Sequence, residues 1–324
     1  MRALITGVSG QDGTILASML AAQGFSVVGL VKPGTEYSRL LRYVPGVEIA
    51  EVDLADHSGI RSVISSVAPT HMWNFGGFTA PGDSWDHSDE VFAVNVDSVR
   101  VMLESLQRVI DSPRFFQASS ASIFEGVDRA PQTESMQPEP KSPYAVSKLE
   151  AMQLVDGARR DLGLFGVSGI FYNHESPLRG VGFVTRKVSH AAARIAAGLE
   201  DRLELGDIEV ARDWGWAPDY VRASILMINA EVPKDYVLAT GISHRLSYFV
   251  EKAFAAVGIV NWQDYVFSTS ENTRTVDTNL MVGDSRAAYL DLGWRHTIDF
   301  DSMAAIMVAH DVAQLADPKA TWEI

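Results

Sequence analysis

The chain has 324 residues, of which 47% are apolar, and its formal net charge is −14. This length and apolar content can bury one large core or two unequal ones. The acidic charge argues against a general nucleic-acid-binding surface, although a few local arginines could still hold a small anionic ligand. The absence of cysteine excludes disulfides and thiolate chemistry and is typical of a cytoplasmic protein. No apolar run reaches the length of about 18 residues that a membrane-spanning helix needs, so we expect no membrane association.

Apolar runs typical of strands alternate with helical stretches through the first 175 residues. Strands are expected over residues 2–6, 25–31, 47–53, 71–75, 114–120 and 165–172. Helices are expected over residues 11–23, 59–67, 91–110 and 143–161. Such alternation predicts βαβ units in a Rossmann-type, doubly wound parallel sheet.

The regular alternation fades after Asn173, where segments with Gly and Pro separate short helices expected over residues 186–199 and 248–257. We therefore expect an α/β protein with a larger domain over residues 1–175 and a smaller mixed α/β lobe over residues 176–324. Some strands and helices are expected to cross this boundary. Ligands of open α/β sheets bind beyond the carboxyl ends of the strands, so the functional site is predicted in the cleft between the two parts.

The segment TGVSGQDG places Gly7, Gly10 and Gly13 between the first strand and the first helix. Glycines let the backbone turn tightly and approach a pyrophosphate, while the amides of the helix N-terminus point at it. The same spacing also occurs at a plain strand–helix turn. Its place in a βαβ unit favours a dinucleotide-binding loop.

Basic residues follow the second strand. Lys32 stands where an acid would bind the ribose hydroxyls of NAD, and Arg39 lies further along. Basic residues in this region favour NADP, so NADP is the expected cofactor, with NAD and a merely solvated Lys32 as alternatives. Asp53 ends the third strand and could accept a hydrogen bond from the adenine amino group, whereas Asp56 is the better N-cap for the next helix.

Tyr144 and Lys148 are four residues apart on a helix that Pro143 can begin, so they share one face. An ammonium near a phenol favours the phenolate, which can exchange a proton with a substrate hydroxyl while hydride moves to or from nicotinamide. Ser120, at a strand end, can share that hydrogen bond. This spacing is common on solvated helices, but with the glycine loop upstream it predicts a catalytic pair.

These motifs resemble those of the extended short-chain dehydrogenase/reductases, and more closely those of one member family, the GDP-mannose 4,6-dehydratases. The segments that carry the resemblance cover almost the whole chain: ITGVSGQDG, SPYAVSKLEA, FYNHESPLRG, FVTRKV, LELGDIEVARDWGWAPDYV, YVLATG and LGWRHT. The resemblance implies an enzyme that oxidises a GDP-sugar at C4, removes water across C5 and C6, and returns the hydride to C6. It also implies a homodimer formed through the helices over residues 91–110 and 143–161, or a tetramer.

The resemblance implies site residues by position. Ser120 matches the catalytic Thr, beside Tyr144 and Lys148. The positions that contact the cofactor are Gly7, Val8, Ser9, Gly10, Gln11, Asp12, Gly13, Lys32, Asp53, Leu54, Phe75, Gly76, Gly77, Thr79, Tyr144, Lys148, His174 and Arg179. The positions that hold the GDP-sugar are Asn173, Lys187, Arg212 and Arg274, the last displaced by two residues. Without the resemblance, surface charge would explain Lys187 and Arg212, and core packing would explain His174.

The loop ASSASIFE departs from the family. Ser122 stands where the family has the Glu that takes the C5 proton, and a neutral serine cannot be that base. Glu125, three residues later, is either a stand-in base or a solvated loop acid. The loop is also similar to Ser-Ser-Ala-Thr-Val-Tyr of nucleotide-sugar 4-epimerases, which need only the C4 steps. Three interpretations stay open: 4,6-dehydration with a substitute base, 4-keto reduction or 4-epimerisation without elimination, and a non-catalytic relative that binds a nucleotide sugar.

Two further segments differ from the family. KPG, residues 32–34, replaces the tandem arginines that read the NADP 2′-phosphate and join subunits. This leaves NADP or NAD, and dimer or tetramer, as alternatives. NFGGFT, residues 74–79, puts extra glycines and Phe78 into the loop expected beside the nicotinamide.

Overall fold

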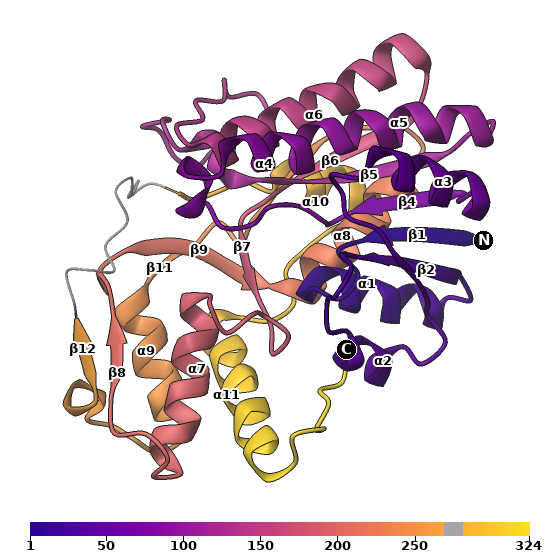
Figure 1. Ribbon diagram of the computed structural model, residues 1–324. Coiled ribbons are helices and arrows are strands. Elements are labelled where there is room, and N and C mark those ends of the chain that lie inside the picture. The colour runs from indigo at the N-terminus through magenta and orange to yellow at the C-terminus, as the bar shows by residue number, and fades with distance from the viewer. Residues whose placement is uncertain (269–280) are drawn as a thin grey trace.

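The computed structural model describes residues 1–268 and 281–324. Its larger layer is a seven-stranded sheet in the order β10-β6-β5-β4-β1-β2-β3, and every neighbouring pair in it is parallel (Figure 1). The strands are β1 (Arg2–Thr6), β2 (Ser26–Val31), β3 (Glu48–Glu51), β4 (His71–Asn74), β5 (Arg114–Ser120), β6 (Phe165–Phe171) and β10 (Tyr236–Leu238). The predicted α/β, Rossmann-type fold is confirmed, and the six expected strands end within two residues of their predicted bounds.

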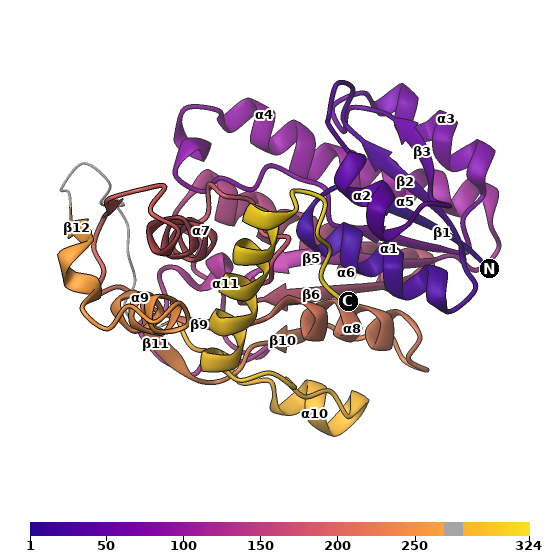
Figure 2. The same ribbon diagram turned by 90° about the horizontal axis from the view of Figure 1, so that it is seen from below.

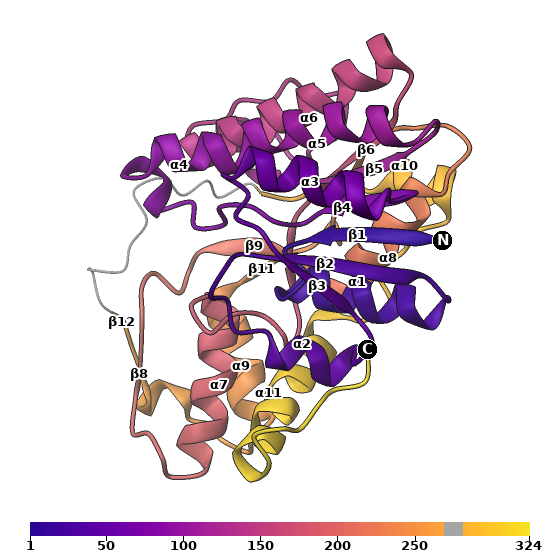
Figure 3. The same cartoon turned by 45° about the vertical axis from the view of Figure 1, so that its right-hand side comes forward.

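Helices cover both faces of this sheet because successive strand residues point to opposite sides. Ala3 and Ile5 of β1 belong to one buried cluster, and Leu4 between them belongs to another. The helices α3 (His57–Val67), α5 (Ser98–Val109) and α6 (Pro143–Leu162) close the Leu4 face, as Figure 3 shows. The opposite face is closed by α1 (Gln11–Ala22) and α8 (Ala217–Ile228), with α2 (Ser38–Tyr43) beside α1.

The helix predicted over residues 91–110 is not continuous. It consists of α4 (Ser88–Phe92), a π-helical turn η2 (Ala93–Asp97) and α5. A π turn fits an extra residue into the helix, and here it contains the buried Asn95. Hydrophobic spacing cannot reveal one wide turn inside an otherwise regular helix, which is why the sequence predicted a single element.

The smaller lobe has its own apolar core and two small sheets. Figure 2 shows this lobe beside the large sheet. One sheet contains β7 (Asn173–Glu175), β9 (Ala211–Trp216) and β11 (Ser243–Arg245), and the other contains β8 (Leu203–Leu205) and β12 (Val266–Ser268). The helices of this lobe are α7 (Val184–Ala196), α9 (Leu246–Ala255) and α11 (Phe300–Ala316). The helices expected over residues 186–199 and 248–257 are thus confirmed, two to three residues earlier than predicted.

The chain beyond residue 176 contributes to both parts of the molecule. α8 covers the large sheet, β10 extends it beside β6, and α10 (Arg286–Leu292) contacts β10. Some elements therefore cross the expected boundary, and the division at residue 175 stays a prediction. Short helical turns η1 (Asp83–Trp85), η3 (Ala121–Phe124) and η4 (Trp262–Asp264) lie in connecting segments. Within the described ranges, no helix is both long and apolar enough to cross a membrane.

A close contact between β2 and the glycine loop generates a test of this arrangement. A Cβ placed on Gly29 would lie 2.8 Å from the Cβ of Val8. We predict that Gly29→Ala lowers the free energy of unfolding by about 1–3 kcal/mol, as overpacking does, measured by urea denaturation. Val8→Gly removes the obstructing Cβ together with its methyl groups, so adding Gly29→Ala to that background should cost much less. Equal costs in both backgrounds would show that Gly29 does not act through Val8.

Candidate functional site

The glycine loop leaves its backbone open to a ligand. Gly7 has a φ of +66°, and a Cβ on it would lie 2.8 Å from the Gly76 nitrogen, in the loop that follows β4. A Cβ on Gly13 would lie 2.8 Å from the Gly7 carbonyl carbon. No side chain of the described residues caps the N-terminus of α1, which begins at Gln11. Glycine at these positions and the open helix N-terminus fit a dinucleotide pyrophosphate.

A buried ion pair joins this loop to the small lobe. His174 Nε2 lies 3.0 Å from Asp12 Oδ2, and His174 Nδ1 lies 2.7 Å from the Tyr172 carbonyl oxygen. Burial opposes the charged forms of both groups, but each carries the opposite charge that the other needs. Their attraction prevails, so it raises the pKa of His174 and lowers the pKa of Asp12. Gln11 strengthens the junction by donating to the His174 carbonyl and accepting from Ser176 Oγ.

Arg179 is held beside this pair. Its Nε lies 3.3 Å from Glu175 Oε2, and its guanidinium stacks 3.6 Å from the centre of the Phe183 ring. The buried Glu175 also accepts a hydrogen bond from Thr185 Oγ1 at 2.6 Å. The sequence-predicted cofactor residues Asp12, His174 and Arg179 therefore lie in one electrostatic cluster. Sequence reasoning missed Glu175 as its fourth member. Its spacing of four residues from Arg179 was no usable signal, because these residues lie at a strand end and in a turn and not on a helix.

The predicted catalytic helix begins at Pro143, as expected, with Ser142 as its N-cap. Lys148 Nζ donates to the Ala118 carbonyl at 3.1 Å and lies 5.7 Å from the centre of the Tyr144 ring. Tyr144 and Lys148 are both buried. Because Ala118 lies two residues before Ser120 on β5, the lysine contact brings α6 to the strand end that carries the serine.

Asn95 supports this region and was not identified from the sequence. Its Oδ1 accepts from the Phe78 nitrogen at 2.8 Å, and its Nδ2 donates to Ser147 Oγ at 3.0 Å. A Cβ on Gly77 would lie 2.7 Å from Asn95 Oδ1 and 3.7 Å from Lys148 Nζ, so the Gly77 backbone lies close to both side chains. The only signal was a polar residue within an apolar helical run, which does not predict burial.

The loop ASSASIFE, which differs from the family's sequence, contains the short turn η3. Ser120 ends β5, and its hydroxyl accepts a hydrogen bond from the Ser122 nitrogen at 3.2 Å. Glu125, directly after this turn, accepts from the backbone nitrogens of Lys141 and Ser142 at 3.2 and 3.0 Å and from the Ser142 hydroxyl. The carboxylate of Glu125 is thus held by hydrogen bonds and is not freely solvated. It anchors the residue that caps the helix of Tyr144.

The expected adenosine-side residues lie between β2, β3 and α4. Lys32 Nζ is 3.4 Å from Asp53 Oδ2 and 3.9 Å from Glu90 Oε1. Asp53 also accepts from the Ala55 nitrogen, and Asp56 caps α3, which confirms the predicted N-cap. Two carboxylates therefore lie within 4 Å of Lys32, one of the two basic residues on which the expectation of NADP was based.

The loop after β4 contains the other expected cofactor positions. The Gly76 nitrogen donates to Thr6 Oγ1 at 2.9 Å, and a Cβ on Gly76 would lie 2.8 Å from Leu54 Cδ1. Phe75 packs its ring 5.5 Å from that of Phe116. Gly76 therefore lies between the expected positions Gly7 and Leu54, and Thr79 follows in the same loop.

The expected substrate residues lie in the small lobe. Asn173 on β7 is exposed and pairs in register with Trp214 of β9, the strand that also carries Arg212. Lys187 on α7 is exposed, and its Nζ donates to the Glu204 carbonyl at 2.6 Å. The structure thus brings Asn173 and Arg212 onto adjacent strands, while Lys187 lies on a helix. Arg274 lies outside the described residues.

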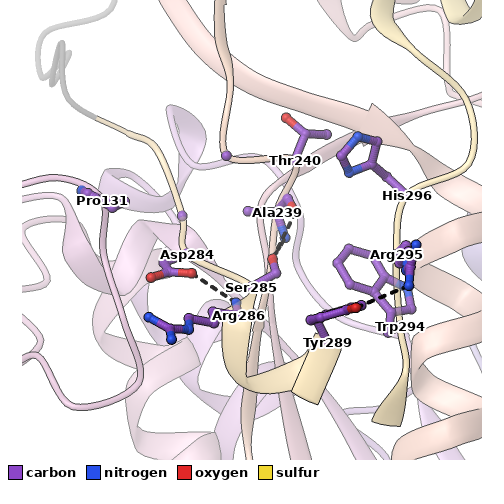
Figure 4. Close-up of a pocket in the computed structure, with 12 residues that line it drawn as sticks. Pro131, Ala239, Thr240, Asp284, Ser285, Arg286, Tyr289, Trp294, Arg295 and His296 are labelled. Carbon is purple, nitrogen blue, oxygen red and sulfur yellow. Dashed lines mark hydrogen bonds between the residues drawn. The ribbon is translucent and has the colours of Figure 1, made fainter. Parts of the chain in front are cut away.

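A cavity of about 620 Å³ lies beside the end of β10. Ser285 Oγ donates to the Ala239 carbonyl and accepts from the Ala239 nitrogen at one wall. Figure 4 shows Tyr289 and Arg295 together at another, joined by a hydrogen bond of 3.1 Å. None of the sequence-predicted site residues lines this cavity, so we assign it no part in the chemistry.

Comparison with known proteins identifies the relatives of this chain. The family described as GDP-mannose 4,6 dehydratase matches residues 4–307. GDP-mannose 4,6 dehydratase 2 of Arabidopsis thaliana is 35% identical over 324 residues, which span 96% of this chain and 86% of the relative. A UDP-glucose 4-epimerase of Thermus thermophilus in complex with NAD superposes with a TM-score of 0.84 at 24% identity, covering 96% and 99% of the two chains. RMD from Pseudomonas aeruginosa complexed with NADPH gives 0.81 at 21% identity, covering 97% and 99%. These two structures share the fold.

The Asp12–His174 pair predicts how stability depends on pH. The raised pKa of His174 gives a contribution that is complete below its ordinary value of 6.5 and is lost as the pH rises through the folded value. The lowered pKa of Asp12 gives a contribution that is present above 3.8 and is lost as the pH falls through its folded value. The pair therefore stabilises most between pH 3.8 and 6.5.

We predict that the urea-unfolding free energy of the wild type falls more steeply above pH 6.5 than that of His174→Gln, which lacks the titrating imidazole. His296→Gln, at an exposed histidine, is the matched control and should keep the wild-type slope. Equal slopes for the wild type and His174→Gln would contradict the ion pair's role.

Proposed function

The chain belongs to the GDP-mannose 4,6-dehydratase family, within the NAD-dependent epimerase/dehydratase superfamily, and on that premise we propose that it is an NAD(P)-dependent enzyme acting at C4 of a GDP-sugar. The observation that carries this proposal is the placement of Tyr144 and Lys148 on a helix anchored to the end of β5, where Ser120 lies. Both are buried, and Lys148 lies close to Gly77, whose neighbour Gly76 packs against Gly7 of the glycine loop. This combination suits redox chemistry at a sugar hydroxyl.

Three side chains of this protein have separate roles in the proposed C4 step. Tyr144, as phenolate, accepts the proton of the C4 hydroxyl, while the Lys148 ammonium stabilises that phenolate. Ser120 shares the hydrogen bond to the same oxygen. NAD(P), when bound, supplies the hydride acceptor at its nicotinamide. Asn95 and Gly77 fix the space around the lysine, so the ammonium keeps its position during proton transfer.

A specific observation favours a second candidate function, C4 chemistry without loss of water. Elimination needs a carboxylate at C5, and the loop offers Ser122 there. Glu125, the nearest acid along the chain, binds backbone nitrogens of Lys141 and Ser142 and the Ser142 hydroxyl. Moving it to a substrate would break these bonds and release the cap of α6. 4-Keto reduction and 4-epimerisation avoid this requirement, since they use only the Tyr144 step.

We keep NADP as the proposed cofactor, with NAD as the alternative. Lys32 gives little support, since Asp53 and Glu90 lie within 4 Å of it. Arg39 gives more support, because its guanidinium donates to the Ser9 carbonyl of the glycine loop at 3.0 Å. Among the solved structures, RMD from Pseudomonas aeruginosa was obtained with NADPH and the Thermus epimerase with NAD, so this fold accommodates both.

The proposed assembly is a homodimer formed through α5 and α6, with a tetramer of two such dimers as the alternative. Sedimentation or light scattering of the purified chain measures it directly. A nucleotide-sugar substrate, with neither nucleic acid nor membrane as a partner, is part of the same proposal, as is a cytoplasmic location.

We predict that Tyr144→Phe lowers hydride transfer from C4 by about 10²- to 10⁴-fold, because the phenol that accepts the proton is lost. The measurement is transfer of deuterium from C4-deuterated GDP-mannose to the cofactor, read by mass spectrometry. Tyr248→Phe removes a phenol on α9 and should react like the wild type. Undiminished transfer in Tyr144→Phe would remove Tyr144 from the proposed chemistry. No transfer in the wild type with any GDP-hexose would leave a non-catalytic binding protein.

We predict that the wild type yields no product lighter by one water, and that Ser122→Glu gains this product because it restores a carboxylate beside C5. Incubation with GDP-mannose followed by mass spectrometry checks both statements. Water loss by the wild type would instead favour 4,6-dehydration. The variant Glu125→Gln then decides the base: abolished water loss assigns it to Glu125, and retained water loss assigns it elsewhere.

A further inference from the structure

A second cavity, of about 370 Å³, lies between α2, the loop over residues 177–181 and α11. Four arginines line it, namely Arg39, Arg42, Arg179 and Arg186. Among the described residues that line it there is no carboxylate. This cluster of guanidinium groups is therefore a local positive site in a chain whose net charge is −14.

Only half of these arginines are neutralised. Arg186 pairs with the buried Asp311, and Arg179 pairs with Glu175. Arg39 instead donates to two backbone carbonyl groups, those of Ser9 at 3.0 Å and Leu178 at 3.1 Å. Arg42 donates to the Pro318 carbonyl at 3.1 Å. In the part of the chain that the structure describes, two guanidinium charges at this cavity therefore have no carboxylate partner.

His310 adds an unused hydrogen-bonding group to the same cavity. Its side chain is 94% buried, and neither ring nitrogen makes a hydrogen bond to the described residues, although the Ala320 backbone lies close by. Burial, helped by the Arg186 guanidinium, lowers the pKa of His310, so the imidazole is neutral near pH 7 and has one N–H to donate. A buried polar group without a partner is costly, and a ligand in the cavity would satisfy it.

We propose that this cavity binds a phosphate dianion, with Arg39 and Arg42 as charge partners and His310 as a neutral donor. The planar guanidinium group matches phosphate oxygens with paired hydrogen bonds, and the volume accommodates a phosphate with some of its water. The phosphate has two possible sources. One is the 2′-phosphate of NADP, because Arg39 also contacts the glycine loop, and the other is a separate phosphate-bearing small molecule. The first source rests on the NADP proposed above, whereas the binding of inorganic phosphate to the cavity does not.

Inorganic phosphate is the probe for the first experiment. Its binding to the full chain is measured by calorimetry at constant ionic strength, with chloride as the reference anion. Saturable binding is expected for the wild type, weakened about 10- to 100-fold in Arg39→Gln and in Arg42→Gln, because each loses a charged hydrogen-bond donor. Arg245→Gln removes a guanidinium that pairs with Glu209 away from the cavity lining and should bind like the wild type.

Titrations with NADP and NAD then distinguish the two sources. If the 2′-phosphate occupies the cavity, Arg42→Gln weakens NADP binding without changing NAD binding, and phosphate competes with NADP alone. If a separate molecule occupies it, phosphate binds equally well to the NADP-saturated protein.

Phosphate binding that is no tighter than chloride binding, or that is unchanged in both arginine variants, would overturn the proposal. Arg42 is exposed, so Arg42→Gln serves as the folded test should Arg39→Gln disturb the glycine loop. These experiments measure binding and need no turnover, so their result does not depend on whether the proposed reaction is confirmed.

Discussion

The buried ion pair between Asp12 and His174 is the contact on which the position of the glycine loop relative to the small lobe depends. It connects the glycine loop at the start of the chain to the first strand of the small lobe, more than 160 residues later. Gln11 adds two hydrogen bonds between the same segments, because it donates to the His174 carbonyl and accepts from Ser176 Oγ. A buried pair of this kind contributes little net stability, but it fixes one arrangement, because any other would leave a charge without a partner. The two lobes are thereby held in one arrangement at the site proposed for a dinucleotide and a sugar.

A second constraint acts on the catalytic helix. Glu125 holds Ser142, Ser142 caps α6, and α6 carries Tyr144 and Lys148. Glu125, three residues after Ser122, therefore already anchors the helix that carries Tyr144. This arrangement is compatible with the proposed C4 chemistry without elimination. Ser122 remains the residue at which the two proposed chemistries separate.

A basic side chain of this protein indicates an anion-binding site only when its own partners in the fold are known. Lys32 and Arg39 belong to the same connection after β2, and both are basic. Lys32 has the carboxylates of Asp53 and Glu90 within 4 Å, whereas the hydrogen bonds of Arg39 to the described residues go to carbonyl oxygens. An anion would find the first already occupied and the second available. Neither the net charge of the chain nor the sign of a single residue distinguishes these two situations.

The sequence by itself determined the larger part of the fold and the identity of the chemical groups. Strand and helix periodicities are local properties, so β1 to β6, α1, α3 and α6 were predictable, as were the Asp56 cap and the loop of Gly7 to Gly13. The three-residue β10 and the π turn around Asn95 were not, because short segments and single wide turns leave no periodic signal. The partners of His174, Glu125 and Arg39 were decided only by the tertiary structure. A charge finds its partner across the fold, at sequence distances that no local pattern records, and that partner determines whether the group is a base, an anchor or an open site for a ligand.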